Sequence, residues 1–220
     1  MKKIVIYGAG GFARELAIHI EEMNQVNEEW EILGFLEDNS NKIGKMLNGY
    51  PILGGVDWLD NWKRNDIYIV LGIGSPSGKK VMYEKVKSKG NYNYPNLIHP
   101  SVKISEYNCF GQGIIVCKGS IITCNTDIKD FVTININSTI GHDTIIENYT
   151  TISPNCSISG NVHLSDGVYL GTQATIIEKL SVGRNSIIGA GAVVVKDIPD
   201  FCTAVGVPAK PIKVNNNNGK

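Results

Sequence analysis

The residues at positions 8–13 form the pattern Gly-Ala-Gly-Gly-Phe-Ala, directly after a short apolar run. A G-x-G-x-x-A turn between a strand and a helix is a variant of the dinucleotide-binding fingerprint. Glycines let the main chain approach a phosphate, and the start of the helix offers amide donors and the positive end of its dipole. The turn therefore predicts binding of a nucleotide or nucleotide-sugar, and a tight turn without a ligand is the alternative interpretation.

Glu37 and Asp38 close a second apolar run, where an acidic pair can accept hydrogen bonds from ligand hydroxyl groups. An NAD-linked enzyme is therefore a competing interpretation. However, only three clear strands are expected before the repeats described below, and a full dinucleotide domain needs two mononucleotide-binding halves. A single half indicates one nucleotide or one nucleotide-sugar.

His142 follows a glycine at an expected corner of the chain and is followed by Asp143. A carboxylate beside an imidazole favours the protonated form of the ring, which suits a general base. The alternative is an ordinary surface histidine. The other repeat histidine, His163, lies 21 residues away, without the cluster of three ligands typical of catalytic zinc, so no metal site is predicted. His19 and His99 are interpreted as structural.

The composition limits the classes of function. Lys plus Arg and Asp plus Glu both number 21 in a chain of 220 residues, so the formal net charge is zero and nothing favours nucleic-acid binding. No apolar run reaches the length of a membrane span, and the glycines after residue 7 argue against a signal peptide. Five cysteines without a CxxC pair predict reduced thiols in a cytoplasmic protein. No membrane partner is expected.

The elements that must position these residues differ between the two halves of the chain. In the first half, apolar runs alternate with segments of helical periodicity, which predicts a parallel sheet with crossover helices. The expected strands cover residues 3–7, 31–36 and 67–71, and the expected helices cover residues 12–23, 56–63 and 79–89.

The second half repeats with a period of six. Every sixth residue from Ile98 to Val194 is Ile, Leu, Val or Phe, over seventeen consecutive repeats. This period suits one short strand and one corner, with the apolar anchor pointing inward and a glycine or small polar residue after it tolerating the corner's backbone angles. Three strands make a coil of 18 residues, so the repeats predict five to six stacked coils around a continuous core.

We therefore expect a half-Rossmann-like α/β domain over residues 1–96, a parallel β-helix with a closing segment over residues 97–213, and a disordered polar tail over residues 214–220. The repeats resemble the hexapeptide-repeat left-handed β-helix, and the left hand follows from this resemblance alone. Together the halves resemble the sugar acyltransferase family, which includes sialic acid O-acetyltransferases and, as the most similar branch, bacterial nucleotide-amino-sugar N-acetyltransferases. The resemblance is carried by the IVIYGAGG start, the LED strand end, the IHPSV join, the hexads, the segment from Asn135 to Asp143, and the VGVPAK ending.

The resemblance implies roles for individual residues. His142 would be the general base, Asp143 would increase its basicity, and Asn135 would line the same site. The family's nucleotide-sugar contacts match Gly10, Gly11, Phe12, Glu37, Asp38 and Gly72. Its acetyl-CoA contacts, in a groove between the β-helices of a homotrimer, match Thr151, Thr172 and Ala190.

These features predict an acetyl-CoA-dependent N-acetyltransferase that acts on the amino group of a UDP-, GDP- or dTDP-linked amino-sugar. The amine would attack the thioester directly, because no cysteine is evidently paired with His142. The alternatives are a sugar O-acetyltransferase of the sialic acid type, transfer of another acyl group, an NAD-linked enzyme, and a non-catalytic scaffold. The sequence identifies neither the nucleotide nor the sugar.

Overall fold

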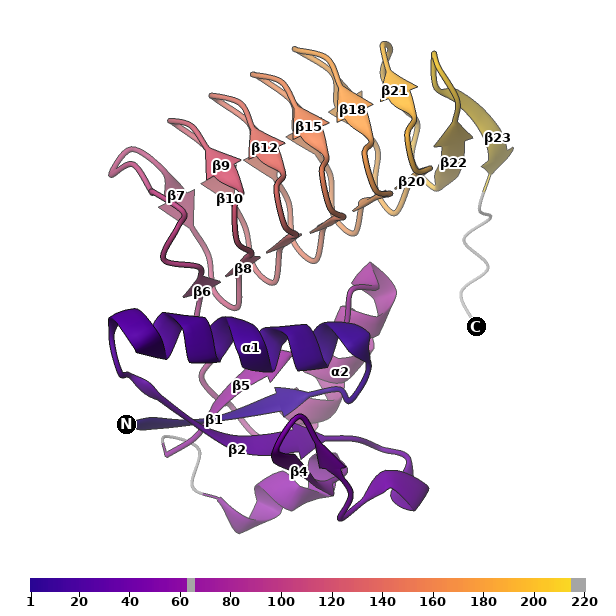
Figure 1. The fold of residues 1–220 in the computed structure, drawn as a ribbon. Helices are drawn as coiled ribbons and strands as arrows, with labels where there is room; N and C mark the ends of the chain where they lie inside the picture. Colours follow the sequence, from indigo (N-terminus) through magenta and orange to yellow (C-terminus); the bar gives the residue numbers. More distant parts are fainter. Residues whose placement is uncertain (63–65, 215–220) are drawn as a thin grey trace. The chain divides into compact units, whose positions relative to one another are not determined.

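The computed structural model describes residues 1–62 and 66–214, and the chain divides into two compact units, Met1–Pro100 and Ser101–Lys220 (Figure 1). The expected helix over residues 56–63 is a 3₁₀ helix, η2 (Val56–Asn61), and residue 63 lies outside the described residues. The expected disordered tail also lies outside them, except for Val214, which ends the last strand.

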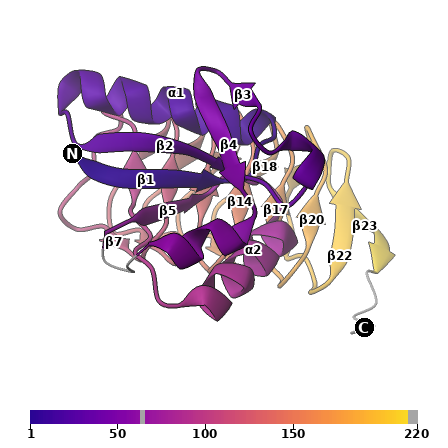
Figure 2. The same ribbon diagram turned by 90° about the horizontal axis from the view of Figure 1, so that it is seen from below.

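The first unit contains a five-stranded sheet in the order β3-β4-β2-β1-β5 (Figure 2). Its strands are β1 (Lys2–Tyr7), β2 (Trp30–Leu36), β3 (Met46–Leu47), β4 (Tyr50–Gly54) and β5 (Tyr68–Leu71). The remaining elements are the helices α1 (Gly11–Val26) and α2 (Pro76–Lys89), the 3₁₀ helix η1 (Ser40–Lys42) and the short strand β6 (Leu97–Ile98). Strand β1 pairs in parallel with both β2 and β5, as expected for crossover helices.

The core of the first unit forms between the central strand and one face of α1. The apolar run of β1 is fully buried from Ile4 to Ile6. Helix α1 buries Ala13, Leu16, Ala17 and Ile20, which recur at the three- and four-residue spacing of one helical face. This packing holds the turn between β1 and α1 at the carboxyl end of the sheet.

A hairpin extends the sheet beyond the three strands expected from the sequence. Strands β3 and β4 are antiparallel and are joined by Asn48 and Gly49, whose φ angles are 46° and 85°. Two positive φ angles in a two-residue loop are the reason why Asn-Gly is favoured in tight hairpins. The expectation of three strands is therefore wrong, because β3 has only two residues, and Pro51 interrupts the short apolar pattern of β4.

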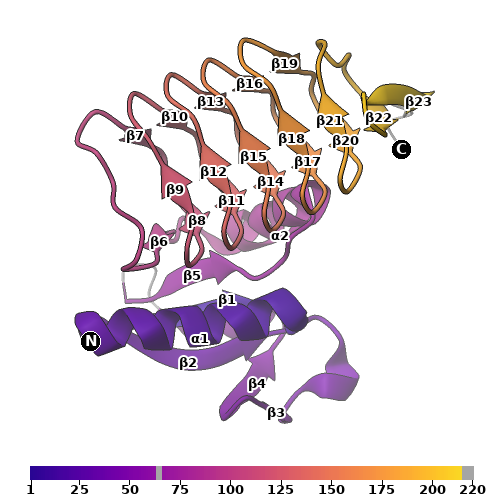
Figure 3. The ribbon, with the colours of Figure 1, turned by 45° about the horizontal axis from the view of Figure 1, so that its top comes forward.

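The second unit is a left-handed parallel β-helix whose coils stack along one axis (Figure 3). One sheet contains β7 (Cys109–Phe110), β10 (Asp127–Ile128), β13 (Ile145–Ile146), β16 (His163–Leu164) and β19 (Ser181–Val182). The next contains β8 (Ile115–Val116), β11 (Thr133–Ile134), β14 (Thr151–Ile152), β17 (Tyr169–Leu170), β20 (Ile187–Ile188), β22 (Cys202–Val205) and β23 (Lys210–Val214). The third contains β9 (Ile121–Ile122), β12 (Thr139–Ile140), β15 (Ser157–Ile158), β18 (Thr175–Ile176) and β21 (Val193–Val194).

The coils stack in the register that the six-residue period predicts. Ile134 pairs with Ile152, and Ile152 pairs with Leu170, each 18 residues further along the chain. These three anchors are fully buried. The coils are also joined by main-chain hydrogen bonds, such as that from the Asn135 amide to the Ile152 carbonyl at 2.9 Å. The predicted core column is confirmed from Val116 to Val194, but the expectation of an inward anchor is wrong at Ile104, which is 38% exposed because the chain forms no strand there.

Two different positions shape each corner. The third residue after an anchor adopts a left-handed φ, as Asn137 does at 55° and Asp143 does at 57°. The glycine directly after an anchor serves close approach instead: a Cβ on Gly141 would lie 2.5 Å from the amide nitrogen of Gly160 in the next coil. The corner's backbone angles are therefore accommodated two residues later than the sequence pattern suggested.

Candidate active site

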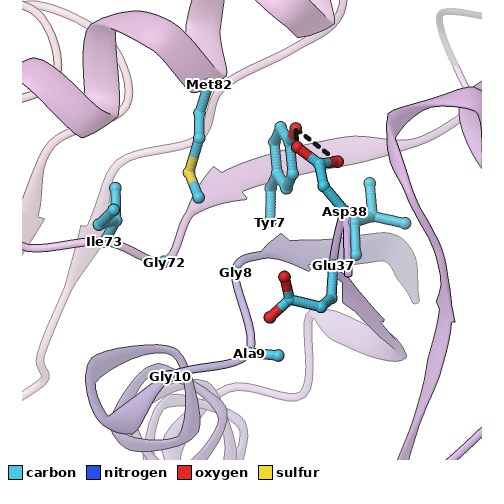
Figure 4. Close-up of a pocket in the computed structure, with 10 residues that line it drawn as sticks. Tyr7, Gly8, Ala9, Gly10, Glu37, Asp38, Gly72, Ile73 and Met82 are labelled. Atoms are coloured by element: carbon cyan, nitrogen blue, oxygen red, sulfur yellow. Dashed lines mark hydrogen bonds between the residues drawn. The ribbon is translucent and has the colours of Figure 1, made fainter. Parts of the chain in front are cut away.

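A cavity of about 250 Å³ opens at the carboxyl ends of the central strands in the first unit (Figure 4). It is lined by Tyr7, Gly8, Ala9, Gly10, Leu36, Glu37, Asp38, Gly72, Ile73 and Met82. The structure thus brings together Gly10, Glu37, Asp38 and Gly72 from the sequence-predicted set. Gly11 and Phe12 are not among its lining residues.

The glycines around the cavity serve different purposes. Gly8 has a φ of 121°, and a Cβ there would lie 2.7 Å from the carbonyl oxygen of Gly72. A Cβ on Gly72 would lie 2.8 Å from side-chain carbons of Ile6 and Ala13. Gly8 and Gly72 are therefore required for the close packing of β1, β5 and α1. At Gly10, by contrast, no heavy atom of the described residues lies within 4 Å of the Cβ position, so this glycine leaves space open.

The first turn of α1 lies beside the open space at Gly10, and no acidic side chain there neutralises the positive electrostatic potential of the helix start. Gly10 is the N-cap residue, and in the described part of the chain no side chain caps the helix there. The first turn contains no acidic residue either. Such a helix start favours an anionic group, because its amide groups and its dipole both attract negative charge.

The acidic pair at the end of β2 divides into two different environments. The hydroxyl of Tyr7 donates to Asp38 at 3.0 Å from Oδ1 and 2.9 Å from Oδ2, as Figure 4 shows, and the ammonium of Lys85 forms an ion pair with Oδ2. Burial acts to raise the pKa of Asp38, but the hydrogen bonds from Lys85 and Tyr7 outweigh it, so this pKa lies below its usual value. Asp38 is therefore already engaged within the protein.

Glu37 is the member of the pair whose side chain extends toward the glycine turn (Figure 4). Its Oε2 accepts from Lys42 Nζ at 2.9 Å, and its Oε1 accepts from the Asn39 amide at 3.2 Å. Each carboxylate oxygen has further acceptor capacity. Glu37 is consequently better placed than Asp38 to receive a hydrogen bond from a ligand.

Tyr7 was not identified from the sequence, although it is the last residue of the strand before the glycine turn. Its side chain is almost fully buried, and burial followed by the hydrogen bond to Asp38 raises its pKa far above the usual value. The hydroxyl therefore remains protonated and donates to Asp38. Met82 and Ile73 were also missed, because no pattern distinguishes pocket-lining apolar residues from core residues.

In the second unit, His142 and Asp143 follow β12 at one corner of the β-helix. His142 Nδ1 lies 2.7 Å from Asp143 Oδ2, and the histidine side chain is 58% exposed. The hydrogen bond from His142, supported by one from Asn125, lowers the pKa of Asp143 against a smaller opposing effect of burial. Asp143 is thus a carboxylate that orients the ring through Nδ1, which leaves Nε2 as the nitrogen that can accept a proton.

Asn135, Thr172 and Ala190 lie at a different corner of the β-helix, after β11, β17 and β20. The side chain of Asn135 accepts from the Ile136 amide at 2.8 Å, and Thr172 and Ala190 are exposed. Strand β12 separates this corner from His142. Thr151 lies on β14 and is only 3% exposed, and its hydroxyl has no hydrogen-bond partner among the described residues.

The predictions on metal binding, membrane spans and the two structural histidines can be compared with the described residues. No three His, Cys, Asp or Glu side chains of residues 1–62 and 66–214 are grouped to hold a metal ion. In the same part of the chain, no helix has both the length and the apolar character needed to cross a bilayer. His19 and His99 are buried and contact each other edge to face, with ring centroids 5.4 Å apart.

Both units of the chain are similar to known proteins. Residues 3–86 match the PglD N-terminal domain. The chain is similar to PerB from Caulobacter crescentus, solved with CoA and GDP-perosamine, at 27% identity over 96% of this chain and 97% of that chain, with a TM-score of 0.82. It is also similar to the acetyltransferase domain of PglB from Neisseria gonorrhoeae, at 31% identity over 96% of this chain and 100% of that domain, with a TM-score of 0.86.

Two further similarities extend the comparison. WeeI from Acinetobacter baumannii is 28% identical over 95% of this chain and 99% of that chain, with a TM-score of 0.84. An acyl-[acyl-carrier-protein]–UDP-N-acetylglucosamine O-acyltransferase from Stutzerimonas stutzeri is 29% identical over 113 residues, which is 51% of this chain and 44% of that protein. The chain spans less than half of the length of the curated relatives that it matches. The PglB domain has also been solved with acetyl coenzyme A.

Proposed function

The chain belongs to the hexapeptide-repeat sugar acyltransferase family, and on that premise we propose that it transfers the acetyl group of acetyl-CoA to the amino group of a nucleotide-linked amino-sugar. The observation that carries the proposal is the exposed His142, whose Nδ1 is held by Asp143 and whose Nε2 is available. Acetyl-CoA is a co-substrate here. The similarity to proteins that bind CoA, acetyl-CoA and GDP-perosamine supports both substrate classes.

The cavity of the first unit supports a nucleotide-sugar as the acceptor. It combines the open side of Gly10, the positive start of α1 and the carboxylate of Glu37. A phosphate group is suited to the helix start, and hydrogen-bond donors of a base or ribose are suited to Glu37. Asp38 and Tyr7 would shape the cavity.

The reaction follows from the orientation of the imidazole. The amine nitrogen attacks the thioester carbonyl carbon, the bond to sulfur breaks, and CoA leaves as the thiolate. His142 Nε2 accepts the proton that the nitrogen loses, and the Asp143 carboxylate stabilises the resulting imidazolium. The proton then passes to the thiolate or to solvent. Holding donor and acceptor together supplies a further large part of the acceleration.

The two corners of the β-helix support a homotrimer. His142 lies at one corner, whereas Asn135, Thr172 and Ala190 lie at another, so a single copy presents its candidate catalytic and CoA-binding residues on different edges. A neighbouring copy that brings its second corner to His142 would complete a crevice for acetyl-CoA. Sedimentation equilibrium should therefore give three times the chain mass, and an active monomer would contradict this arrangement. We propose a cytoplasmic location, because the five cysteines include no CxxC pair, a pattern that favours reduced thiols.

A turnover assay across GDP-, UDP- and dTDP-linked 4-amino-sugars tests the function. CoA release is followed with a thiol reagent, and the product is identified by mass spectrometry as about 42 Da heavier, the net gain when an acetyl group replaces one amine hydrogen. One amino-sugar should be acetylated efficiently by the native chain, and about 10²–10⁴-fold more slowly by His142→Ala. Acetylation of none of them would reject the proposal.

A second candidate function is acetyl transfer to a sugar hydroxyl, because the repeats are similar to those of an O-acyltransferase. A hydroxyl acceptor also needs a general base, so the His142 geometry alone does not separate the two. The same assay distinguishes them when each amino-sugar is paired with its hydroxyl counterpart. Preference for the hydroxyl sugar would favour the O-acetyltransferase.

A further inference from the structure

We propose that Gly160 is a positioning residue for His142, because its missing side chain leaves the space in which the imidazole lies. Gly160 is 18 residues after His142 and occupies the same corner one coil later, as the pairing of Ile140 with Ile158 shows. The Asn161 amide donates to the His142 carbonyl at 2.8 Å, which fixes the two coils against each other. This inference rests on the proposed role of His142 as general base.

The contact between the two residues is direct. A Cβ on Gly160 would lie 2.6 Å from both Cε1 and Nε2 of His142 and 3.0 Å from Cδ2. These ring atoms are the three nearest heavy atoms, and real Cβ atoms do not approach neighbours at such distances. A side chain at position 160 would therefore occupy the space at the Nε2 edge of the ring.

The backbone gives no other reason for glycine at this position. Gly160 is not among the residues with a positive φ, so an L-amino acid can adopt its conformation. Gly141 differs in this respect, because a Cβ there would meet the main chain of the next coil at 2.5–2.6 Å. Gly141 is required for the stacking of coils, whereas Gly160 is required for the ring.

The same corner position in other coils supports this distinction. One coil before His142 it holds Cys124, and after Gly160 it holds Glu178 and then Lys196. The corner therefore accepts side chains of ordinary size. Glycine occurs in the coil against which the imidazole lies.

The chemical consequence follows from which nitrogen is free. Nδ1 is engaged by Asp143 at 2.7 Å, so Nε2 must receive the proton of the acceptor. With a methyl group at position 160, the ring must either rotate, which lengthens the bond to Asp143, or keep its place with Nε2 covered. Both responses reduce proton transfer, since a catalytic base misplaced by about 1 Å can lose on the order of 10²-fold in rate.

The test is a double-mutant cycle with Gly160→Ala, His142→Ala and the double variant, measured for kcat, both KM values and thermal unfolding. We expect Gly160→Ala to lower kcat about 10- to 100-fold. In the His142→Ala background the same change should leave the residual kcat unaltered, because the ring through which Gly160 acts is absent. Lys196→Ala, at the same corner two coils later, is the matched control and should keep native turnover.

Each outcome of the double-mutant cycle either supports or contradicts the proposed role of Gly160. Full activity of Gly160→Ala, or an equal loss in the His142→Ala background, would overturn the positioning role. If Gly160→Ala unfolds, recovery of the native melting temperature in the double variant would support a clash with the ring, and failure to recover it would overturn the proposal. Native activity of His142→Ala alone would instead reject the proposed function, so the two failures are distinguishable.

Discussion

The Nδ1 atom of His142 lies 2.7 Å from the Oδ2 atom of Asp143, the next residue in the chain. Neighbouring residues reach each other in this way at a corner where Asp143 has a left-handed φ of 57°. Aspartate tolerates that conformation better than most residues, as asparagine does at the equivalent position of other coils. The corner thus fixes both the carboxylate and the orientation of the ring.

Replacement of His142 with alanine should lower kcat by about 10²–10⁴-fold, the usual contribution of a general base. The melting temperature should change little, because the side chain is 58% exposed. Steady-state kinetics and differential scanning fluorimetry measure the two effects. His163→Ala is the control. This histidine lies on β16, in a different sheet from β12, with its Nε2 3.3 Å from Glu147 Oε1, and should be replaceable without loss of turnover. An equal loss in both variants would argue against a specific role of His142.

Asp143→Asn should lower kcat by less than His142→Ala does. Asparagine retains the left-handed conformation and the shape of the side chain but removes the charge that stabilises the imidazolium. Comparison of kcat for the two variants at the same pH measures the difference. Native kcat in Asp143→Asn would show that the carboxylate contributes nothing beyond its shape.

Gly10→Ser should raise the KM for the nucleotide-sugar without reducing stability. Serine is a favoured N-cap residue, and the described residues leave space around the Cβ position. Its hydroxyl would nevertheless compete with a phosphate for the amides at the start of α1. Gly72→Ala is the contrasting variant, since its Cβ would meet Ile6 and Ala13 at 2.8 Å, and overpacking of this kind costs about 1–3 kcal/mol of unfolding free energy. Urea unfolding and substrate titrations separate the two effects, and an unchanged KM in Gly10→Ser would remove the helix start from the binding site.

Tyr7→Phe should lower the unfolding free energy by about 1.5 kcal/mol at neutral pH, because it removes a half-buried hydrogen bond to a charged carboxylate. The pKa of Asp38 is lowered in the folded state, so the stabilisation that it provides is present above its unfolded value of about 3.8 and declines as the pH falls. The difference between native and variant chains should therefore shrink in acid. Urea unfolding at pH 7 and at about pH 2.5, below the unfolded pKa of Asp38, measures this trend, and a constant difference would contradict it.

Acid should destabilise the first unit through His19. Burial, followed by the nearby charge of His99, lowers the pKa of His19 from 6.5 to about 4. Between these values the unfolded chain binds a proton that the folded chain does not, so stability falls as the pH drops from about 6.5 to about 4. The loss amounts to at most about 3 kcal/mol. His19→Leu should abolish this part of the pH dependence in urea titrations, and an unchanged acid profile would exclude His19 as its source.

The sequence alone determined the β-helix and the place of its histidine. A six-residue apolar period sets both the inward face and the 18-residue register, because burying the anchors from Val116 to Val194 leaves no other alignment of coils. The same counting places His142 on an exposed corner. The glycine turn was also recognisable in the sequence. Side chains disfavour a backbone angle such as the φ of 121° at Gly8, so glycine marks the turn.

Only the tertiary structure decided which of the candidate side chains meet. Asp38 is engaged by Tyr7 from β1 and by Lys85 from α2, elements far from it in sequence, so the acidic pair expected to act together is divided between Asp38 and Glu37. Asn135 and His142 are close in sequence but lie at different corners, because a strand intervenes. The physical reason is that a repeating hydrophobic pattern specifies burial and register locally, whereas hydrogen bonds between separate elements depend on the distances that their packing sets.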